Sequence, residues 1–397
     1  MKKTCLVAAL LAPLASVHLA SAQTNPMSND ATMFPNPIYM AGSSAIVPML
    51  SKVAVKLAGQ ATIIYKSSAS CDGPNAIAND ADLTGTASYY VVDPADATKV
   101  LTNKVCDLAP GTKAAVGVSD VSFKTCIGTA APATIGDFQA MVQSMLLVVP
   151  ESNTTLTAMS AEQAAAIWGC GAKGMIGAYV DELAIQQRND TSGTQKMVAA
   201  YIGVPSNAMK GKMNAATGDL VTSLLAVADP TKAIGFVAAD AYETRRAMLN
   251  SLAFRGFGQT KAYYPDSNAT ATDKRNVRDG HYIIQGPLHL IAKASAGVPT
   301  DANAKKAIDW LQGTVPFEAG NAKSYIDVVA KVGNVPQCAM KVKRDDDGGL
   351  LQPYTPAAAC GCYFEAVATG VAAPAGCTAC TDDTTCGGKK CNFGFCE

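Results

Sequence analysis

The segment 188–194 reads Arg-Asn-Asp-Thr-Ser-Gly-Thr and combines residue types that bind a tetrahedral oxyanion. Arg188 offers a planar fork of N–H donors that matches such an anion. The Ser-Gly-Thr that follows presents hydroxyls and free backbone amides at the start of a helix expected over 194–202. Asp190 is placed to hold Arg188 by an ion pair. An exposed arginine before an ordinarily capped helix explains the same segment equally well.

Three other polar turns occupy positions where α/β proteins bind ligands. The turn 42–44 (Gly-Ser-Ser) precedes an expected helix, whose free amides and partial positive charge suit an anion, although a serine cap is its commoner role. The turn 67–73, which contains Ser70, follows an expected strand and is by itself only a Ser/Gly loop. Asp120 ends another expected strand, where an aspartate more often forms a turn or caps a helix.

The elements that position these turns alternate between short apolar runs and helical periodicity. Strands are expected over 37–40, 61–65, 114–118, 145–149, 184–187, 233–237 and 281–284. Helices are expected over 46–57, 160–168, 194–202, 220–227 and 301–311, and Ser160 with Gln163 forms a capping box. This alternation predicts an α/β fold with a parallel or mixed sheet.

Composition excludes several classes of protein. The chain has 397 residues, of which 49% are hydrophobic and 16% charged, so it is long enough for two lobes and too apolar for a disordered chain. The formal net charge is +0, so no basic face for nucleic acid or an anionic membrane is indicated.

The N-terminus has the pattern of a secretory signal. Lys2 and Lys3 precede the apolar stretch 6–14, and the small residues 20–22 predict cleavage near Ala22 and Gln23. The other interpretation is a buried N-terminal helix. No stretch of the mature chain is long enough to span a bilayer. We therefore expect a periplasmic, extracellular or cell-surface protein.

The cysteines fit an exported chain. Of 13 cysteines, Cys5 lies in the predicted signal, and the even number that remains predicts disulfides. We expect four of them to staple loops of the lobes: Cys71, Cys106, Cys126 and Cys170. After residue 336 the composition changes, with a polar turn or linker over 344–349 and eight cysteines from Cys338 onward. Cys377 and Cys380 have the spacing of metal ligands, but export and the lack of histidine favour disulfides of open connectivity.

Enzyme signatures are missing from the sequence. Only His281 and His289 follow the predicted signal, so a multi-histidine metal site is not available, and structural roles are the expectation for both. There is no Gly-x-Ser-x-Gly elbow and no dinucleotide or Walker glycine loop. We expect no enzyme activity, no cofactor and no metal.

The order and spacing of the four turns resemble the substrate-binding protein of bacterial high-affinity phosphate ABC transporters. The matching segments are 41–45, 65–70, 117–120 and 188–194, with further similarity at 159–169 and 233–236. The resemblance covers residues 37–335, is specific at 188–194 and is loose elsewhere. Three departures stand out: Ser44 replaces the usual threonine, the segments 80–110 and 240–280 are longer or rearranged, and the tail has no counterpart.

The resemblance implies a two-lobe periplasmic-binding-protein fold with mixed sheets and a hinge of two crossing strands, plus a disulfide-rich C-terminal extension. Lobe 1 would comprise 37–135 and 236–335, lobe 2 would comprise 136–235, and the Cys-rich tail 336–397. Carried over by position, the phosphate contacts would be Ser43, Ser44, Ser70, Asp120, Arg188, Ser192, Gly193 and Thr194, with Asp190 as the supporting ion-pair partner.

The implied function is extracytoplasmic capture of hydrogenphosphate or a similar oxyanion by a monomer, for uptake through an ABC permease. Hydrogenphosphate carries a proton that a buried Asp120 accepts, whereas sulfate carries none and meets a like charge. A second interpretation is a surface or envelope protein that reuses the scaffold and is attached by its Cys-rich tail.

Overall fold

The computed structural model describes residues 25–101 and 104–397, so the predicted signal 1–22 and its cleavage site lie outside the described residues. The first strand–helix–strand unit comprises β1 (Pro37–Ser43), α1 (Val47–Lys56) and β2 (Thr62–Ser68). β1 and β2 are parallel, with Pro37 opposite Thr62 and Ser43 opposite Ser68. The strand, the turn and the helix lie where the sequence predicts them.

Lobe 1 is built on a mixed sheet. Its strands are β1, β2, β3 (Thr86–Tyr89), β6 (Val105–Asp107) and β7 (Val116–Ser119). β7 and β2 flank β1 in parallel, and β3 and β6 continue the sheet antiparallel. The helices of this lobe are α1, α2 (Asp72–Ala78), α3 (Phe123–Ile127) and α9 (Ala302–Gln312).

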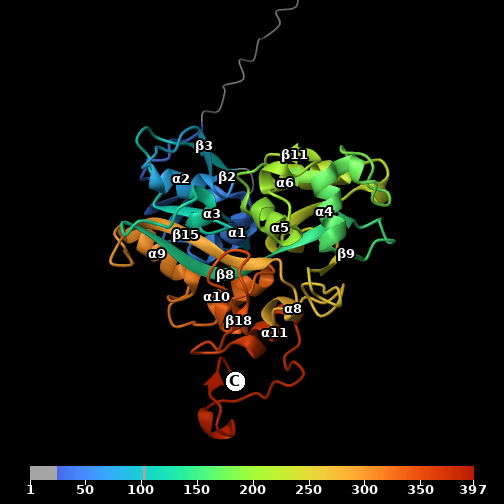
Figure 1. The fold of residues 1–397 in the computed structure, drawn as a ribbon. Coiled ribbons are helices and arrows are strands. Elements are labelled where there is room, and N and C mark those ends of the chain that lie inside the picture. Colours follow the sequence, from blue (N-terminus) through green and yellow to red (C-terminus); the bar gives the residue numbers. More distant parts are fainter. Residues whose placement is uncertain (1–24, 102–103) are drawn as a thin grey trace, which may run out of the picture.

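Two long strands join the lobes. β8 (Ile135–Pro150) pairs along most of its length with β15 (Gln285–Ser295), which itself pairs with β7 of lobe 1. The last residues of β8 pair instead with β12 (Gly235–Ala238) and β13 (Leu249–Ser251). β8 therefore extends the lobe 1 sheet to β12 and β13, so that one strand order, β12-β8-β15-β7-β1-β2-β3-β6, runs through the two-lobe α/β architecture that Figure 1 shows.

Lobe 2 carries shorter strands and three of the predicted helices. Its elements are β9 (Ala158–Ser160), α4 (Ala161–Cys170), β10 (Gln186–Arg188), α5 (Gly193–Ile202), β11 (Lys212–Asn214) and α6 (Thr217–Leu225). β10 and β11 are parallel, and a bridge from Ile185 to Ile234 links them to β12. The capping box at Ser160 and Gln163 is formed as predicted.

One predicted strand is wrong. Residues 281–284 form bends, and the strand begins at Gln285. The amide of Tyr282 donates to the Asn276 carbonyl at 2.7 Å, and its buried hydroxyl donates to the Met145 carbonyl at 2.8 Å. These turn contacts hold the backbone away from a strand ladder.

The remaining elements lie mostly beside the junction and in the tail. The helices are α7 (Ala239–Glu243), α8 (Arg275–Arg278), α10 (Ser324–Lys331) and α11 (Gly361–Thr369). The short strands are β4 (Val92–Asp93), β5 (Asp96–Val100), β14 (Ala253–Arg255), β16 (Val298–Pro299), β17 (Val342–Lys343), β18 (Gln352–Pro353), β19 (Cys391–Asn392) and β20 (Phe395–Cys396). Within the described part of the chain, no helix is long and apolar enough to cross a membrane.

Within residues 25–101 and 104–397 five disulfides are formed, and four of them lie in the tail: Cys338–Cys360, Cys362–Cys377, Cys380–Cys391 and Cys386–Cys396. The fifth, Cys71–Cys126, joins the turn beside Ser70 to α3. The expectation that Cys106 and Cys170 also form staples is wrong. Cys106 is buried with apolar residues of β2 and β3, whereas Cys170 is exposed at the end of α4. The disulfides fit an extracytoplasmic protein.

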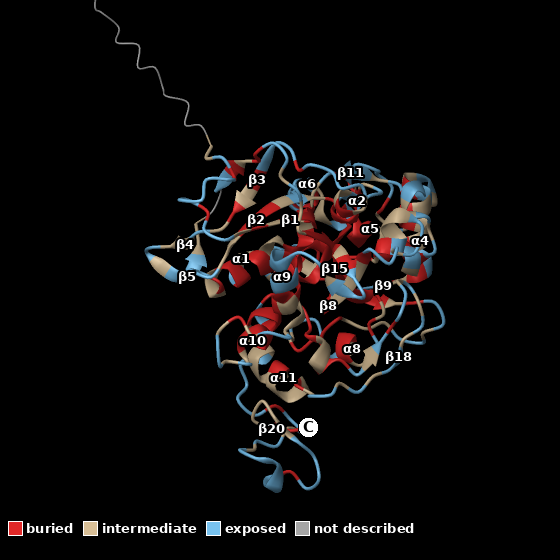
Figure 2. Cartoon of the chain, turned by 90° about the vertical axis from the view of Figure 1, so that its left-hand side faces the viewer, coloured by how far each residue is buried: buried red, intermediate tan, exposed pale blue. Residues whose placement is uncertain are grey.

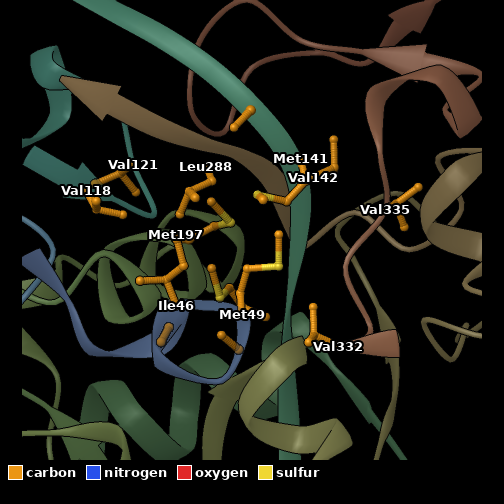
Figure 3. Close-up of a cluster of buried hydrophobic side chains, with 14 of the residues drawn as sticks. Ile46, Met49, Val118, Val121, Met141, Val142, Met197, Leu288, Val332 and Val335 are labelled. Atoms are coloured by element: carbon orange, nitrogen blue, oxygen red, sulfur yellow. The ribbon is translucent and has the colours of Figure 1, made fainter. Parts of the chain in front are cut away.

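The largest apolar core is continuous through both lobes. Figure 2 shows buried residues concentrated on the crossing strands and on the inner faces of the helices. In Figure 3, Met197 of α5 lies beside Ile46 and Leu288. A Cβ atom on Gly286 would lie 2.8 Å from the Met197 methyl carbon, so α5 packs directly on the backbone of β15. Lobe 2 is thus docked against the crossing strands, close to lobe 1.

Candidate functional site

The Asp120 carboxylate lies at the meeting point of three polar turns. It accepts hydrogen bonds from Ser43 Oγ at 2.7 Å, Ser70 Oγ at 3.0 Å and Thr194 Oγ1 at 3.0 Å. Ser43 and Ser70 belong to lobe 1, whereas Thr194 belongs to α5 of lobe 2. Asp120 is only 1% exposed, so these neutral hydroxyls replace the water that a free carboxylate would have.

Sheet geometry explains why the lobe 1 residues converge. β1, β2 and β7 are parallel neighbours, so their carboxyl ends meet at one edge, and Ser43, Ser70 and Asp120 lie at or just after those ends. Gly42 permits the close approach of β1 and β7, because a Cβ at its φ of +130° would lie 2.0 Å from the Val118 carbonyl oxygen. The resemblance groups these three residues, and the structure brings them together; their contact with an anion stays a prediction.

The start of α5 fits directly against lobe 1. A Cβ on Gly193 would lie 2.8 Å from Ser70 Oγ and 2.9 Å from Asp120 Cβ, so a larger residue would push the lobes apart. The Cys71 amide donates to the Thr191 carbonyl at 3.0 Å across the same contact. Ser192 caps α5 by accepting from the Gln195 amide at 3.4 Å. The predicted turn 188–194 is therefore part of the interface between the lobes.

Arg188 forms a second group beside this cluster. Its Nε donates to the Asn214 carbonyl at 3.2 Å, Nη1 to Thr217 Oγ1 at 2.8 Å and Nη2 to the Ala215 carbonyl at 2.9 Å. Arg188 is 3% exposed, and burial lowers its pKa while the negative charges of Asp120 and Asp219 oppose that change. Among the described residues, no carboxylate forms a direct ion pair with Arg188.

The predicted ion pair between Arg188 and Asp190 is wrong. The Asp190 carboxylate, which is half exposed, lies 3.7 Å from Lys196 Nζ and accepts from Ser206 Oγ. Arg188 ends β10 and turns toward β11 and α6, whereas Asp190 faces Lys196, which lies in the first turn of α5. The two side chains therefore occupy different faces of the turn.

Thr217 links Arg188 to lobe 1 and was not predicted. Ser44 Oγ lies 3.3 Å from Thr217 Oγ1 and accepts from the Thr217 amide at 3.4 Å. Thr217 begins α6 directly after the short strand β11, so a hydroxyl at a helix start was the available signal. Three residues of β11 are too few for the apolar pattern to reveal that strand.

Asp240, on α7, is a second buried carboxyl that the sequence did not single out. Its Oδ1 accepts from the Ala241 amide at 2.8 Å, and its Oδ2 has no hydrogen-bond partner among the described residues. Burial, and next the nearby charge of Asp120, raise the pKa of Asp240 well above its usual range. Burial, and after it the nearby Tyr90, Asp120 and Asp240, raise the pKa of Tyr65 well above its usual range, and its hydroxyl donates to the Ser43 carbonyl at 2.6 Å. Asp240 therefore stays a neutral acid over a wider pH range than an ordinary aspartic acid does.

No family model and no curated protein matches the chain. Three similar solved structures have low sequence identity. A high-affinity periplasmic phosphate-binding protein bound with phosphate (PfluDING) is 13% identical, with a TM-score of 0.49, over 76% of this chain and 90% of its own. An ABC-type phosphate transport receptor from Vibrio cholerae is 14% identical, with a TM-score of 0.44, over 75% and 99%. A phosphate-binding protein from Stenotrophomonas maltophilia is 11% identical, with a TM-score of 0.45, over 76% and 90%. At this distance function must be argued from the site itself.

Proposed function

We propose that this protein binds hydrogenphosphate, or a similar protonated tetrahedral oxyanion, between its two lobes without changing it chemically. The observation that carries the proposal is the buried Asp120 carboxylate, which hydroxyls from both lobes surround and which has no cation in contact among the described residues. Such a group binds a ligand that brings its own proton. The same hydroxyls can turn their donors toward the anion when it replaces them at Asp120.

Donors for the anion charge lie on both sides of Asp120. A guanidinium has five N–H donors, and Arg188 uses three of them on Asn214, Ala215 and Thr217. Among the described residues the other two N–H groups have no recorded acceptor, so they are available to an anion beside Arg188. The first amides of α5, at Gly193 and Thr194, add the partial positive charge of a helix start.

Selectivity against sulfate follows from the acceptor character of Asp120. A carboxylate accepts the proton of hydrogenphosphate in a charge-assisted bond, but against sulfate it faces only acceptors. An unpaired, desolvated contact of this kind costs about 1–3 kcal/mol, or roughly 5- to 150-fold in affinity.

The test is calorimetric titration of anion-stripped protein with phosphate and then sulfate. We expect binding of phosphate without sulfate, and in Asp120→Asn a loss of phosphate affinity of about 10- to 100-fold without a comparable loss for sulfate. Asp96→Asn, which neutralises an exposed carboxylate in the β5 hairpin, is the matched control and should bind like the parent. An unchanged anion preference in Asp120→Asn contradicts the proposed role.

The proposed setting is the periplasm or cell exterior, with an ABC permease as the uptake partner of a monomeric receptor. A second candidate function is a surface or envelope protein that reuses the scaffold. The feature that favours it is the tail, in which four disulfides stabilise a module beyond the lobes. If neither anion binds, this second function is supported and the tail becomes the place to seek a partner.

A further inference from the structure

A loop of the C-terminal tail returns to the junction of the lobes. Residues 344–351 connect β17 to β18, which pair antiparallel with Val342 opposite Pro353. Asp347 in this loop accepts from the Ser122 amide at 2.7 Å and from Thr125 Oγ1 at 2.5 Å. Ser122 is the cap residue of α3 and lies two positions after Asp120. The tail thus contacts the segment that carries the central carboxylate of the site.

The same loop is tied to the crossing strands. Asp347 Oδ1 lies 3.7 Å from His289 Nε2, and His289 Nδ1 lies 2.6 Å from Asp137 Oδ1. Asp137 in turn accepts from the Phe123 amide at 2.8 Å, the first amide of α3. A buried network therefore joins the tail, β8, β15 and α3.

On its other side the loop contacts lobe 2. The Arg344 guanidinium carbon lies 5.2 Å from the centre of the Tyr201 ring, and Nη2 donates to the Ile283 carbonyl at 3.2 Å. A Cβ on Gly348 would lie 3.4 Å from Ala200 Cβ, so the loop backbone touches α5. Tyr201 and Ala200 belong to the helix that begins with Gly193 and Thr194.

Arg344 is buried, at 6% exposure, and Asp347 is partly buried, with its side chain 9% exposed. Arg344 Nε and Nη1 have no hydrogen-bond partner within the described chain. Two buried charges on a six-residue polar segment are not expected of a passive linker, because charges are rarely buried without a specific contact. The expectation of a polar linker at 344–349 is thus incomplete, since part of the segment is packed between the lobes.

We propose that residues 344–349 form a strap that bridges α3 of lobe 1 and α5 of lobe 2, so that the Cys-rich tail restrains the opening of the lobes. Separating α5 from α3 requires the strap to release the Tyr201 contact or the Asp347 contacts. The consequence for anion exchange rests on the proposed function, whereas the restraint on lobe opening does not.

The first arm of the test measures lobe separation directly. Spin labels on the exposed native Cys170 of lobe 2 and on Lys52→Cys of α1 report the distance between the lobes without added anion. Asn has nearly the shape of Asp, and Met keeps most of the aliphatic chain of Arg. We expect Asp347→Asn and Arg344→Met each to shift the distribution of spin-label distances to longer values. Asp346→Asn is the matched control: it removes only a solvent-exposed ion pair with Lys124 at 3.6 Å, in which the side chains are 71% and 63% exposed. Such surface pairs contribute little, so this variant should retain the parent distribution. Parent-like distances in both strap variants overturn the proposal.

The second arm measures release of radiolabelled inorganic phosphate. We expect the dissociation rate to rise about tenfold in Asp347→Asn, the size expected for losing hydrogen bonds to a charged group, and to stay unchanged in Asp346→Asn. Should phosphate bind to no variant, including the parent, the proposed function fails, while the distance measurement still decides the strap. Equal release rates together with parent-like distances contradict the strap and leave the binding function intact.

Discussion

Two buried charge clusters differ in how their charges are compensated. Near α8, Lys274 Nζ lies 2.5 Å from Glu243 and 2.9 Å from Asp266, and Arg246 contacts the same two acids. Every charge there has an opposite partner. Around Asp120, the buried carboxylate contacts neutral hydroxyls, and the buried Arg188 contacts two carbonyls and a hydroxyl.

This difference separates structural from ligand-directed charges. An ion pair that is complete within the protein leaves nothing to recruit a ligand, whereas charges held by neutral dipoles still carry an uncompensated field. Substitutions in the Lys274 cluster should therefore lower stability and spare binding. Substitutions that remove a charge from the site should instead abolish or weaken binding, at a smaller cost in stability than in the Lys274 cluster.

The largest expected effect on stability is that of Lys274→Met. It leaves Asp266 and Glu243 short of a buried cation, and we expect the free energy of unfolding to fall by about 3–5 kcal/mol. Urea unfolding measures this change, and phosphate affinity of the folded fraction should be unaltered. Lys305→Met removes only an exposed helix pair with Asp309 and should cost less than about 0.5 kcal/mol. Equal costs for the two variants would show that the buried cluster contributes no more than a surface pair.

The pH dependence of the His289 network comes next. Burial lowers the pKa of His289, but contacts with Asp137 and Asp347 outweigh burial and raise it to about 9. Because the folded pKa is raised, the stabilisation is complete below the unfolded value of about 6.5 and is lost as the pH passes 9. We expect a loss on the order of 3 kcal/mol between these limits.

Thermal unfolding of the parent and of His289→Gln from pH 6 to pH 10 isolates this contribution. The difference in stability between the two proteins should shrink as the pH rises, since the parent alone loses the charged imidazolium. A difference that is constant with pH would mean that His289 stays neutral in the folded protein.

Arg188→Met is expected to destabilise less than Lys274→Met. It removes donors from the Asn214 and Ala215 carbonyls and from Thr217 Oγ1, which costs about 1–3 kcal/mol. Phosphate binding should nevertheless be lost, because the described part of the site holds no other cation in contact with these groups. Urea unfolding measures the loss of stability of Arg188→Met, and calorimetric titration of the same protein preparation measures its loss of phosphate binding. If Arg188→Met binds phosphate like the parent, Arg188 does not serve ligand binding and the two charge clusters do not differ in function.

Local patterns predicted the strand ends, whereas the grouping of Ser43, Ser70 and Asp120 came only from the resemblance to phosphate-binding proteins. Apolar residues that recur with a period of two in strands and of 3.6 in helices locate the ends of these elements to within a few residues. The partners of Arg188 could not be predicted, because Asn214 ends a strand too short to recognise and Ala215 and Thr217 follow it. All three meet Arg188 only in the folded lobe.

Long-range pairings were equally inaccessible. Cys106 and Cys170 lie apart from each other and from the paired cysteines, and spacing alone contains no connectivity. The strap loop has the composition of an exposed turn, so nothing local distinguishes the buried Asp347 from its exposed neighbour Asp346. Both cases depend on tertiary contacts of high sequence separation.

The smallest expected effect, and the one that tests the electrostatics of the site most directly, is that of Asp240→Asn. Its pKa is raised by burial and by Asp120, so the unfolded chain releases this proton first, near pH 3.9. The stability of the parent then falls as the pH rises toward the folded pKa, whereas an asparagine adds no such slope. At neutral pH the variant should therefore be modestly more stable in urea unfolding, with the difference growing upward from pH 4, while Asp346→Asn should track the parent. Parallel profiles would mean that Asp240 is ionised beside Asp120. Two carboxylate charges would then oppose the single Arg188, and the field at the site would disfavour an anion.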